Sequence, residues 1–190
     1  MDLIPTSGFK VDKEEMDLLS YLEAKTGAFA KDCIIDNKRE VVIFVVEKAN
    51  LGRVIGKGGN TIKSLRTALH RDVEVVGFAP EFENFVKSLF HPAEIKEIRK
   101  KSVKNSENID LEIIVPKKDV GRAIGKSGRI LERARLILDR HYDNFGNIRV
   151  SAYEAPVEQL MPELPKEYGE QETNESEEVS EEVPEQESEE

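Results

Sequence analysis

Cysteine is nearly absent from this chain, because Cys33 is the only one in 190 residues. A single cysteine excludes an internal disulfide framework and is typical of a reducing compartment. Cys33 lies in an apolar strand pattern, so we expect a small buried hydrophobe rather than a nucleophile. No stretch approaches the ~18 consecutive apolar residues of a membrane span, and residues 1–5 lack the basic start and apolar run of a signal peptide. We therefore expect a cytoplasmic protein.

Histidine is also scarce, and His70, His91 and His141 are isolated from one another in the sequence. With one cysteine they cannot build a zinc site, and no carboxylate pair stands out among the many acidic residues. We therefore expect no metal, no cofactor and no enzymatic activity. His141 has Tyr142 and Phe145 nearby and could stack on a nucleobase, but packing or surface placement is the favoured interpretation.

An excess of basic residues is missing too: 28 Lys and Arg against 38 Asp and Glu give a net charge of −10. That total argues at first against a nucleic-acid partner, but the charge is segregated. Residues 154–190 hold 15 acidic residues and one basic residue, which leaves 27 basic and 23 acidic residues, a net of +4, in residues 1–153. The body is mildly basic and the end strongly acidic, an asymmetry that is informative in itself.

What the chain does contain is one short segment in two copies, residues 51–65 and 120–134. Each copy has an apolar residue, then Gly-x-x-Gly with a lysine inside, then apolar residues at helical spacing. Nine positions of residues 51–71 recur unchanged 69 residues later: Gly52, Arg53, Ile55, Gly56, Lys57, Gly59, Arg66, Leu69 and Arg71. Such an internal repeat indicates a duplicated supersecondary unit.

The paired glycines predict a tight turn between two helices, where the missing side chains let another backbone come close. A loop that opens a helix exposes N–H groups that attract phosphate, so we predict a clamp for a nucleic-acid backbone; plain helix–turn–helix packing is the alternative. Lys57 and Lys126 would neutralise phosphates, while Ile55 and Ile124 would anchor the loops to the core. The candidate binding residues are Ile55, Gly56, Lys57, Gly58, Gly59, Lys63 and Arg66, and in the second copy Ile124, Gly125, Lys126, Ser127, Gly128, Arg129 and Arg133, with Arg53, Arg122 and Arg135 as further groove candidates.

Residues 121–127 also resemble a Walker A loop, which cradles nucleotide phosphates. The segment is one residue short of G-x-x-x-x-G-K-[ST], and no strand runs directly into it. In the first copy Gly58 stands in the place of Ser127, so the magnesium-binding hydroxyl is absent there. We therefore expect no ATPase activity.

The first repeat predicts the order helix, strand, strand, helix, helix, strand. Its first helix opens near Asp12, with Glu15 completing a capping box and Gly27 closing the helix. A hairpin over residues 30–47 follows, turning at residues 36–38. Its second arm is apolar without alternation, as expected of a strand covered on both faces.

The second repeat predicts the same order after a short link at residues 79–80. The apolar positions of residues 82–90 fall at helical spacing, residues 95–103 and 109–115 form a hairpin, and residues 147–151 alternate as a closing strand. An extra segment, residues 141–146, separates the copies. Because each unit of about 70 residues is marginal alone, we expect the two to pack as one rigid body with an α+β fold.

Together these motifs resemble KH domains. Val54-Ile55-Gly-x-x-Gly-x-x-Ile62 and Ala123-Ile124-Gly-x-x-Gly-x-x-Leu131 look like the KH signature, and the element order is similar to the type II form, with a three-stranded mixed sheet packed against helices. Tandem KH units without further domains look like the archaeal NusA-like transcription factors. The expected domains are a lead at residues 1–10, KH domains at 11–79 and 80–154, and a disordered acidic tail at 155–190.

The resemblance implies binding of single-stranded RNA and a role in transcription elongation, termination or antitermination beside RNA polymerase. Bacterial relatives carry an N-terminal polymerase-binding domain and an S1-type domain that do not fit here, which leaves polymerase contact open. The alternatives are a protein-interaction scaffold that works through the acidic tail without RNA binding, and RNA binding in ribosome or RNA-decay work. The tail itself either solvates the protein or competes with RNA for the basic clamp.

Overall fold

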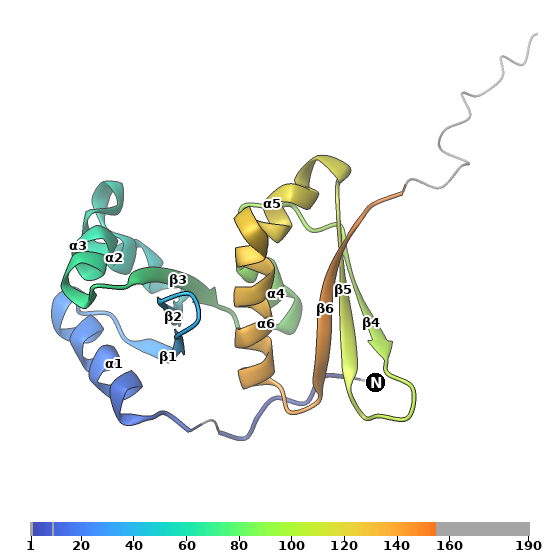
Figure 1. Ribbon diagram of the computed structural model, residues 1–190, viewed down its shortest axis with the longest axis horizontal. Helices are drawn as coiled ribbons and strands as arrows, with labels where there is room; N and C mark the ends of the chain where they lie inside the picture. Colours follow the sequence, from blue (N-terminus) through green and yellow to red (C-terminus); the bar gives the residue numbers. More distant parts are fainter. Residues whose placement is uncertain (1, 9, 155–190) are drawn as a thin grey trace, which may run out of the picture. The chain divides into compact units, whose positions relative to one another are not determined.

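Two copies of one element order make up the computed structural model, which describes residues 2–8 and 10–154 (Figure 1). The α+β prediction is confirmed, since each copy has helices packed on a three-stranded mixed sheet. The predicted disordered tail lies outside the described residues. The elements of the first copy are α1 (Lys13–Thr26), β1 (Ala30–Asp36), β2 (Val41–Glu47), η1 (Lys48–Asn50), α2 (Leu51–Ile55), η2 (Lys57–Gly59), α3 (Asn60–Leu69) and β3 (Asp72–Phe78).

The second copy repeats this order without a gap. Its elements are α4 (Phe82–Leu89), β4 (Glu97–Ser102), β5 (Ile109–Val115), η3 (Lys117–Asp119), α5 (Val120–Ile124), η4 (Lys126–Gly128), α6 (Arg129–His141) and β6 (Phe145–Ala152). In each sheet the central strand is β2 or β5, antiparallel to the strand before it and parallel to β3 or β6.

The start and end of α1 form as their sequence predicts. Asp12 Oδ1 accepts from the Glu15 N–H at 2.8 Å, and Glu15 Oε2 accepts from the Asp12 N–H at 3.0 Å, so the capping box is complete. Gly27 ends the helix in the left-handed region with φ 64°, a conformation that glycine adopts without steric cost.

The core of the first copy lies between its sheet and α1, α2 and α3. Val42, Phe44 and Val46 of β2 point to this side and are fully buried. The alternate residues Val41, Ile43 and Val45 point to the other face and are buried as well. The prediction that β2 is covered on both faces is therefore confirmed.

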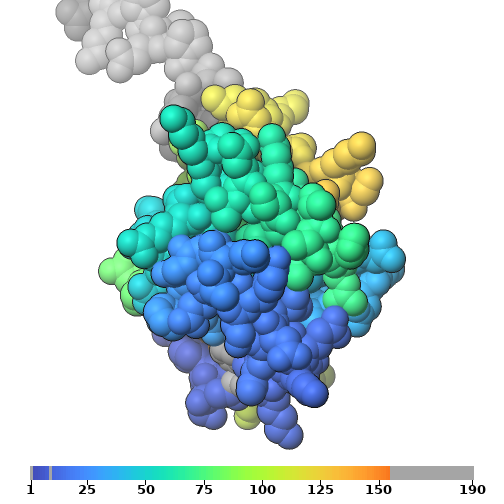
Figure 2. All heavy atoms as spheres, turned by 90° about the vertical axis from the view of Figure 1, so that its left-hand side faces the viewer, coloured from blue at the N-terminus to red at the C-terminus, as the bar shows by residue number. Residues whose placement is uncertain are grey.

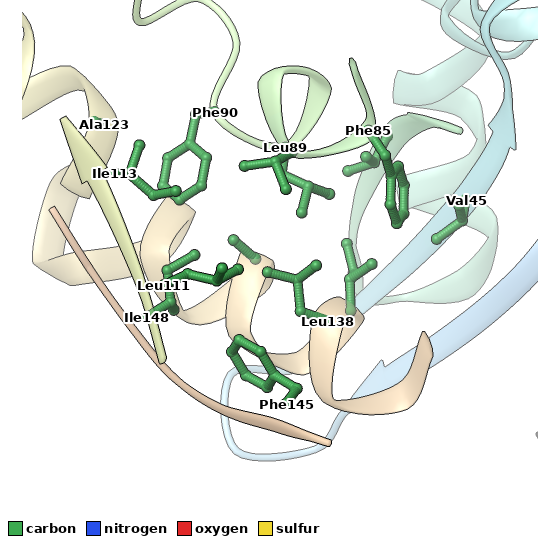
Figure 3. Packing of buried hydrophobic residues seen from close by; sticks show 14 of the residues in the cluster. Val45, Phe85, Leu89, Phe90, Leu111, Ile113, Ala123, Leu138, Phe145 and Ile148 are labelled. Carbon is green, nitrogen blue, oxygen red and sulfur yellow. The ribbon is translucent and has the colours of Figure 1, made fainter. Parts of the chain in front are cut away.

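The second face of this sheet is covered by the second copy. Val41, Ile43 and Val45 belong to the same buried cluster as Phe85 and Leu89 of α4. Figure 3 shows Phe85 between Val45 and the interior of the second copy, where Leu111, Ile113 and Ile148 lie. One continuous core thus joins the copies, and residues 1–154 form one compact unit, as expected from the short link.

The extra segment at residues 141–146 is shorter as a loop than the sequence suggests. Helix α6 runs through His141 and β6 begins at Phe145, so only Tyr142, Asp143 and Asn144 connect them. This connection binds the N-terminal lead. The Ile4 N–H donates to Asn144 Oδ1 at 2.7 Å, and the Asp143 N–H donates to the Ile4 carbonyl at 3.0 Å.

Candidate nucleic-acid interface

The first glycine of each Gly-x-x-Gly loop is required by the backbone. Gly56 has φ 74° and ψ 168°, and Gly125 has φ 77° and ψ 168°, a region that is essentially restricted to glycine. A Cβ atom on Gly56 would lie 2.8 Å from the backbone nitrogen of Thr61, and one on Gly125 would lie 3.0 Å from that of Ile130. The predicted close approach of another backbone is therefore present in both loops.

The third and fourth positions of each loop have left-handed backbone without this crowding. Gly58 and Ser127 occupy equivalent places with φ 61° and 53°, and a Cβ on Gly58 would meet nothing within 4 Å. Gly59 and Gly128 then precede α3 and α6 with φ 76° and 74°. Because a serine fits at the third position, the loop tolerates an exposed side chain there.

The helices that follow the loops begin without side-chain caps. Gly59 and Gly128 stand at the N-cap positions of α3 and α6, and neither helix start receives a side-chain hydrogen bond. Uncapped N–H groups at a helix start favour an anionic ligand. Lys57 and Lys126 lie at the tips of the loops, exposed. Among the described residues neither lysine has an ion-pair partner.

Both loops lie at the same end of the unit. The connection between α2 and α3 (teal) and that between α5 and α6 (yellow) are at the top in Figure 1, and they stay at the top in the perpendicular view of Figure 2. A strand that contacts both loops would have to follow this end of the unit.

The isoleucine before each loop does not anchor it, and this prediction is wrong. Ile55 is 40% exposed, whereas the preceding residue, Val54, is fully buried. In the second copy Ala123 is fully buried and Ile124 is only partly covered. The helical turn places residue 54 or 123 toward the sheet and leaves the isoleucine beside the loop, where it can contact a ligand.

Arg129 and Arg133 are not available in the way the sequence predicts. Arg129 Nε lies 2.6 Å from Glu74 Oε1, and Arg129 also pairs with Asp72. Arg133 pairs with Glu74 at 2.9 Å, donates to the Leu89 carbonyl at 2.6 Å, and has only 12% of its side chain exposed. Both residues therefore hold α6 against β3 of the first copy, and the prediction that Arg133 lines an open groove is wrong.

The other lysines and arginines that the sequence predicts for the binding groove are either paired or exposed. Arg66 pairs with Asp72 at 2.8 Å and donates to the Val73 carbonyl, so it braces α3 against β3. Arg122 pairs with the buried Asp119 at 3.1 Å. Lys63 is exposed on α3 and has no ion-pair partner within the described part of the chain. Arg53 donates to the Gly27 carbonyl and Arg135 to Asn147 Oδ1, both from exposed positions.

The sequence-based prediction did not include two lysines that precede α5. Lys117 and Lys118 of η3 are exposed directly before α5. Lys48 holds the place of Lys117 in the first copy, 69 residues earlier. Extending the repeat three residues toward the N-terminus would have revealed this matched pair of cations.

The aromatic residues near His141 are packed. His141 is 5.6 Å from the Phe85 ring centroid and its Nε2 lies 3.2 Å from Asp32 Oδ2. Tyr142 stands edge-on to Phe82 at 5.5 Å, and Phe145 is buried. The packing interpretation is therefore confirmed.

Cys33 is fully buried, and burial raises the pKa of its thiol to about 12, so it is an inert hydrophobe as predicted. Across residues 2–8 and 10–154 no cluster of three metal-ligating side chains occurs. In the same residues no helix has the length and apolar character to cross a membrane.

Comparison with known proteins agrees with this architecture. The KH domain family model matches residues 19–78. The chain is 34% identical to the protein in "Crystal structure of APE1850", with a TM-score of 0.68, covering 74% of this chain and 100% of that one. The fold and the Gly-x-x-Gly loops thus define a KH-domain protein.

The sequence relatives are more specific. A "Probable transcription termination protein NusA" from Halobacterium salinarum is 32% identical over 70% of this chain and 93% of its own length. The protein of the same name from Methanocaldococcus jannaschii is 29% identical over 70% of each chain. The chain therefore belongs to the family of archaeal NusA-like proteins.

Proposed function

We propose that the protein binds single-stranded RNA with both Gly-x-x-Gly loops and acts in transcription elongation, termination or antitermination, in the cytoplasm, with RNA polymerase as a partner. The names of its relatives support the transcriptional role. The observation that carries RNA binding is that two loops 69 residues apart share one backbone conformation, an uncapped helix start and an exposed lysine.

The mechanism is a clamp on the sugar–phosphate backbone. The N–H groups at the start of α3 and α6 donate to phosphate oxygens, and Lys57 and Lys126 add positive charge. Ile55 and Ile124 flank the bound strand beside the loops. A KH loop grips about four nucleotides, so two loops at one end can hold about eight. This function needs no cofactor and no catalytic residue.

We also propose that both copies are type II KH domains, with boundaries at residues 11–79 and 80–154. The order helix, strand, strand, helix, helix, strand in each copy supports this assignment. The link between them is residues Ala79 to Glu81, between β3 and α4.

The test is RNA binding by full-length variants with anions in the loops. Lys57→Asp with Gly58→Asp disables the first loop, and Lys126→Asp with Ser127→Asp disables the second. Asp tolerates left-handed backbone, and Gly58 has free space around it, so the fold should persist. We expect each pair of changes to weaken binding of a single-stranded oligonucleotide at least tenfold at low salt, measured by fluorescence anisotropy.

A matched control comes from the loop between β4 and β5. Lys104 is exposed and Asn105 has φ 59°, so Lys104→Asp with Asn105→Asp makes the same charge change on similar backbone. This control should bind RNA within about twofold of the unchanged protein. If the control loses as much RNA affinity as the loop variants, the loss comes from net charge and not from the loops. If the unchanged protein does not bind RNA, the scaffold function is favoured.

A further inference from the structure

A cleft lies beside the first Gly-x-x-Gly loop, between α1 and α3. Its volume is about 360 Å³, and it is lined by Tyr21, Lys25, Asn60, Thr61, Ser64, Leu65 and Ala68. This volume is within the range of small-molecule binding sites. Figure 2 looks onto the face of the unit that carries α1 (blue) and α3 (teal to green).

The cleft borders the loop directly. Thr61 lines the cleft and is also the residue that crowds Gly56, since a Cβ on Gly56 would lie 2.1 Å from Thr61 Oγ1. Asn60, the first residue of α3, lines the cleft as well. A strand held at the loop is therefore within one nucleotide of the cleft.

The lining has the side chains that recognise an unpaired nucleotide. The Tyr21 ring is partly exposed and packs against the core of the first copy, which fixes it as a platform. The Lys25 ammonium lies over this ring, 5.6 Å from its centroid. It would have to move aside for a base to stack on Tyr21, and it would then be close enough to pair with the adjoining phosphate. Thr61 and Ser64 offer hydroxyls on the opposite wall. Single-stranded RNA is bound by stacking on aromatic rings and by hydrogen bonds to base edges and 2′-hydroxyls.

The equivalent face of the second copy is closed. The positions 69 residues after Asn60 and Ser64 are Arg129 and Arg133, which pair with Asp72 and Glu74 of β3. The position after Ala68 is Ile137, which is fully buried. This helix face is therefore used for contact in the second copy, and in the first copy it carries small polar side chains instead.

We propose that the cleft between α1 and α3 binds one nucleotide of single-stranded RNA, with its base stacked on Tyr21 and its phosphate beside Lys25. This site rests on the proposed RNA-binding function and extends it. The path of the strand then continues from the first loop onto α1, which makes the first copy the larger RNA-binding surface of the two.

The experiment compares binding of oligouridines of increasing length by full-length variants. Tyr21→Leu keeps an apolar side chain on the core but removes the ring, and it should weaken binding of the longer oligouridines about tenfold. Tyr21→Phe should bind as the unchanged protein does. Tyr153→Leu removes a tyrosine that is 41% exposed at the end of β6, away from the cleft, and it should have no effect.

A second variant covers the case in which Tyr21→Leu unfolds. Ala68→Glu places bulk and negative charge into the cleft from an exposed helix position, and Thr67→Glu makes the same change one residue away, outside the cleft. Only Ala68→Glu should weaken binding. If both cleft variants bind like the unchanged protein while the loop variants lose RNA, the cleft proposal is wrong and the loop proposal stands. If the cleft variants weaken binding and the loop variants do not, the loop proposal is wrong; no binding by any form overturns both.

Discussion

At the scale of single residues, the two loops separate glycines required by crowding from glycines that only adopt an unusual φ. Gly56 and Gly125 face the backbone of the next helix, whereas Gly58 faces open space. The chain itself makes this comparison, since Ser127 occupies the place of Gly58 with φ 53°. Glycine is therefore required by packing at Gly56 and Gly125. At Gly58 its effect is to leave the backbone open to a ligand.

This difference predicts that a change from glycine to alanine lowers the free energy of unfolding by different amounts at the two positions. Gly56→Ala should lower the free energy of unfolding by about 3 kcal/mol, because strained backbone and a steric clash combine. Gly58→Ala should cost about 1 kcal/mol, the penalty for left-handed backbone alone. Urea denaturation of the two variants provides the measurement. Equal losses would mean that the crowding at Thr61 relaxes easily.

Residue-scale prediction from sequence failed where the outcome depends on a partner far along the chain. The repeat identifies the loops, and the clustering of cations around the second loop predicts that Arg129 and Arg133 bind RNA together with Lys126. Their partners, Asp72 and Glu74, are more than 50 residues away in the sequence. Only the packing of α6 on the first copy brings these charges together, and no local pattern encodes it.

At the scale of elements, the two sheets differ in the face that points away from their own helices. In β2 this face carries Val41, Ile43 and Val45, which the second copy covers. The matching positions of β5 are Asp110, Glu112 and Ile114. Two of these three side chains are carboxylates, and Ile114 is buried, so among the described residues this face is more polar than the apolar face of β2 that the second copy covers.

Glu112 is the centre of that polar face. Its carboxylate pairs with Lys101 Nζ at 2.6 Å and with Arg149 at 3.1 Å, and it accepts a hydrogen bond from the Ser151 hydroxyl at 2.8 Å. The hydrogen bond from Lys101 is the largest of the causes that lower the pKa of Glu112 to about 2. Because this pKa is lowered, ionised Glu112 stabilises the folded state at pH values above the ordinary pKa of glutamate. That stabilisation is lost as the pH falls toward 2.

We therefore expect Glu112→Gln to lower the free energy of unfolding by about 1 kcal/mol at pH 7, with the difference shrinking between about pH 4.5 and 2. Denaturation curves over that pH range test this. Glu107→Gln, an exposed change in the loop between β4 and β5, should have no comparable effect. A Glu112→Gln deficit that stays constant down to pH 2 would contradict the assignment.

Element-scale prediction from sequence succeeded where local signals agree. The capping box at Asp12, the unbroken apolar run of β2 and the amphipathic pattern of α4 each gave an element that the structure contains. The segment at residues 141–146 was less well predicted, because α6 runs through His141 and the short connection to β6 contacts the N-terminal lead. Such a contact spans nearly the whole described chain and leaves no local trace.

At the scale of the whole unit, ion pairs join the two copies in addition to their shared apolar core. Asp32 of β1 is fully buried and lies 3.0 Å from Arg140 Nε, while Arg140 also pairs with Glu15 at 2.9 Å. A buried carboxylate is tolerated only when it is paired in this way. Together with the contacts of Arg129 and Arg133, these pairs fix α6 on the first copy along its length.

A fixed α6 also fixes the second loop, since η4 leads directly into this helix. The two Gly-x-x-Gly loops are therefore held within one compact unit, which supports the proposal that they act together as one preformed surface. Preformed sites on a rigid body avoid the entropic cost of ordering a linker when a strand engages both.

The most direct test of the account is a titration with single-stranded RNA of about four and about ten nucleotides, using the full-length protein with neither, one or both loops disabled by the aspartate pairs. We predict that the unchanged protein binds the longer RNA at least tenfold more tightly than the shorter one, and that disabling either loop removes this advantage. If disabling one loop leaves the affinity for the longer RNA unchanged, the loops do not act as one clamp.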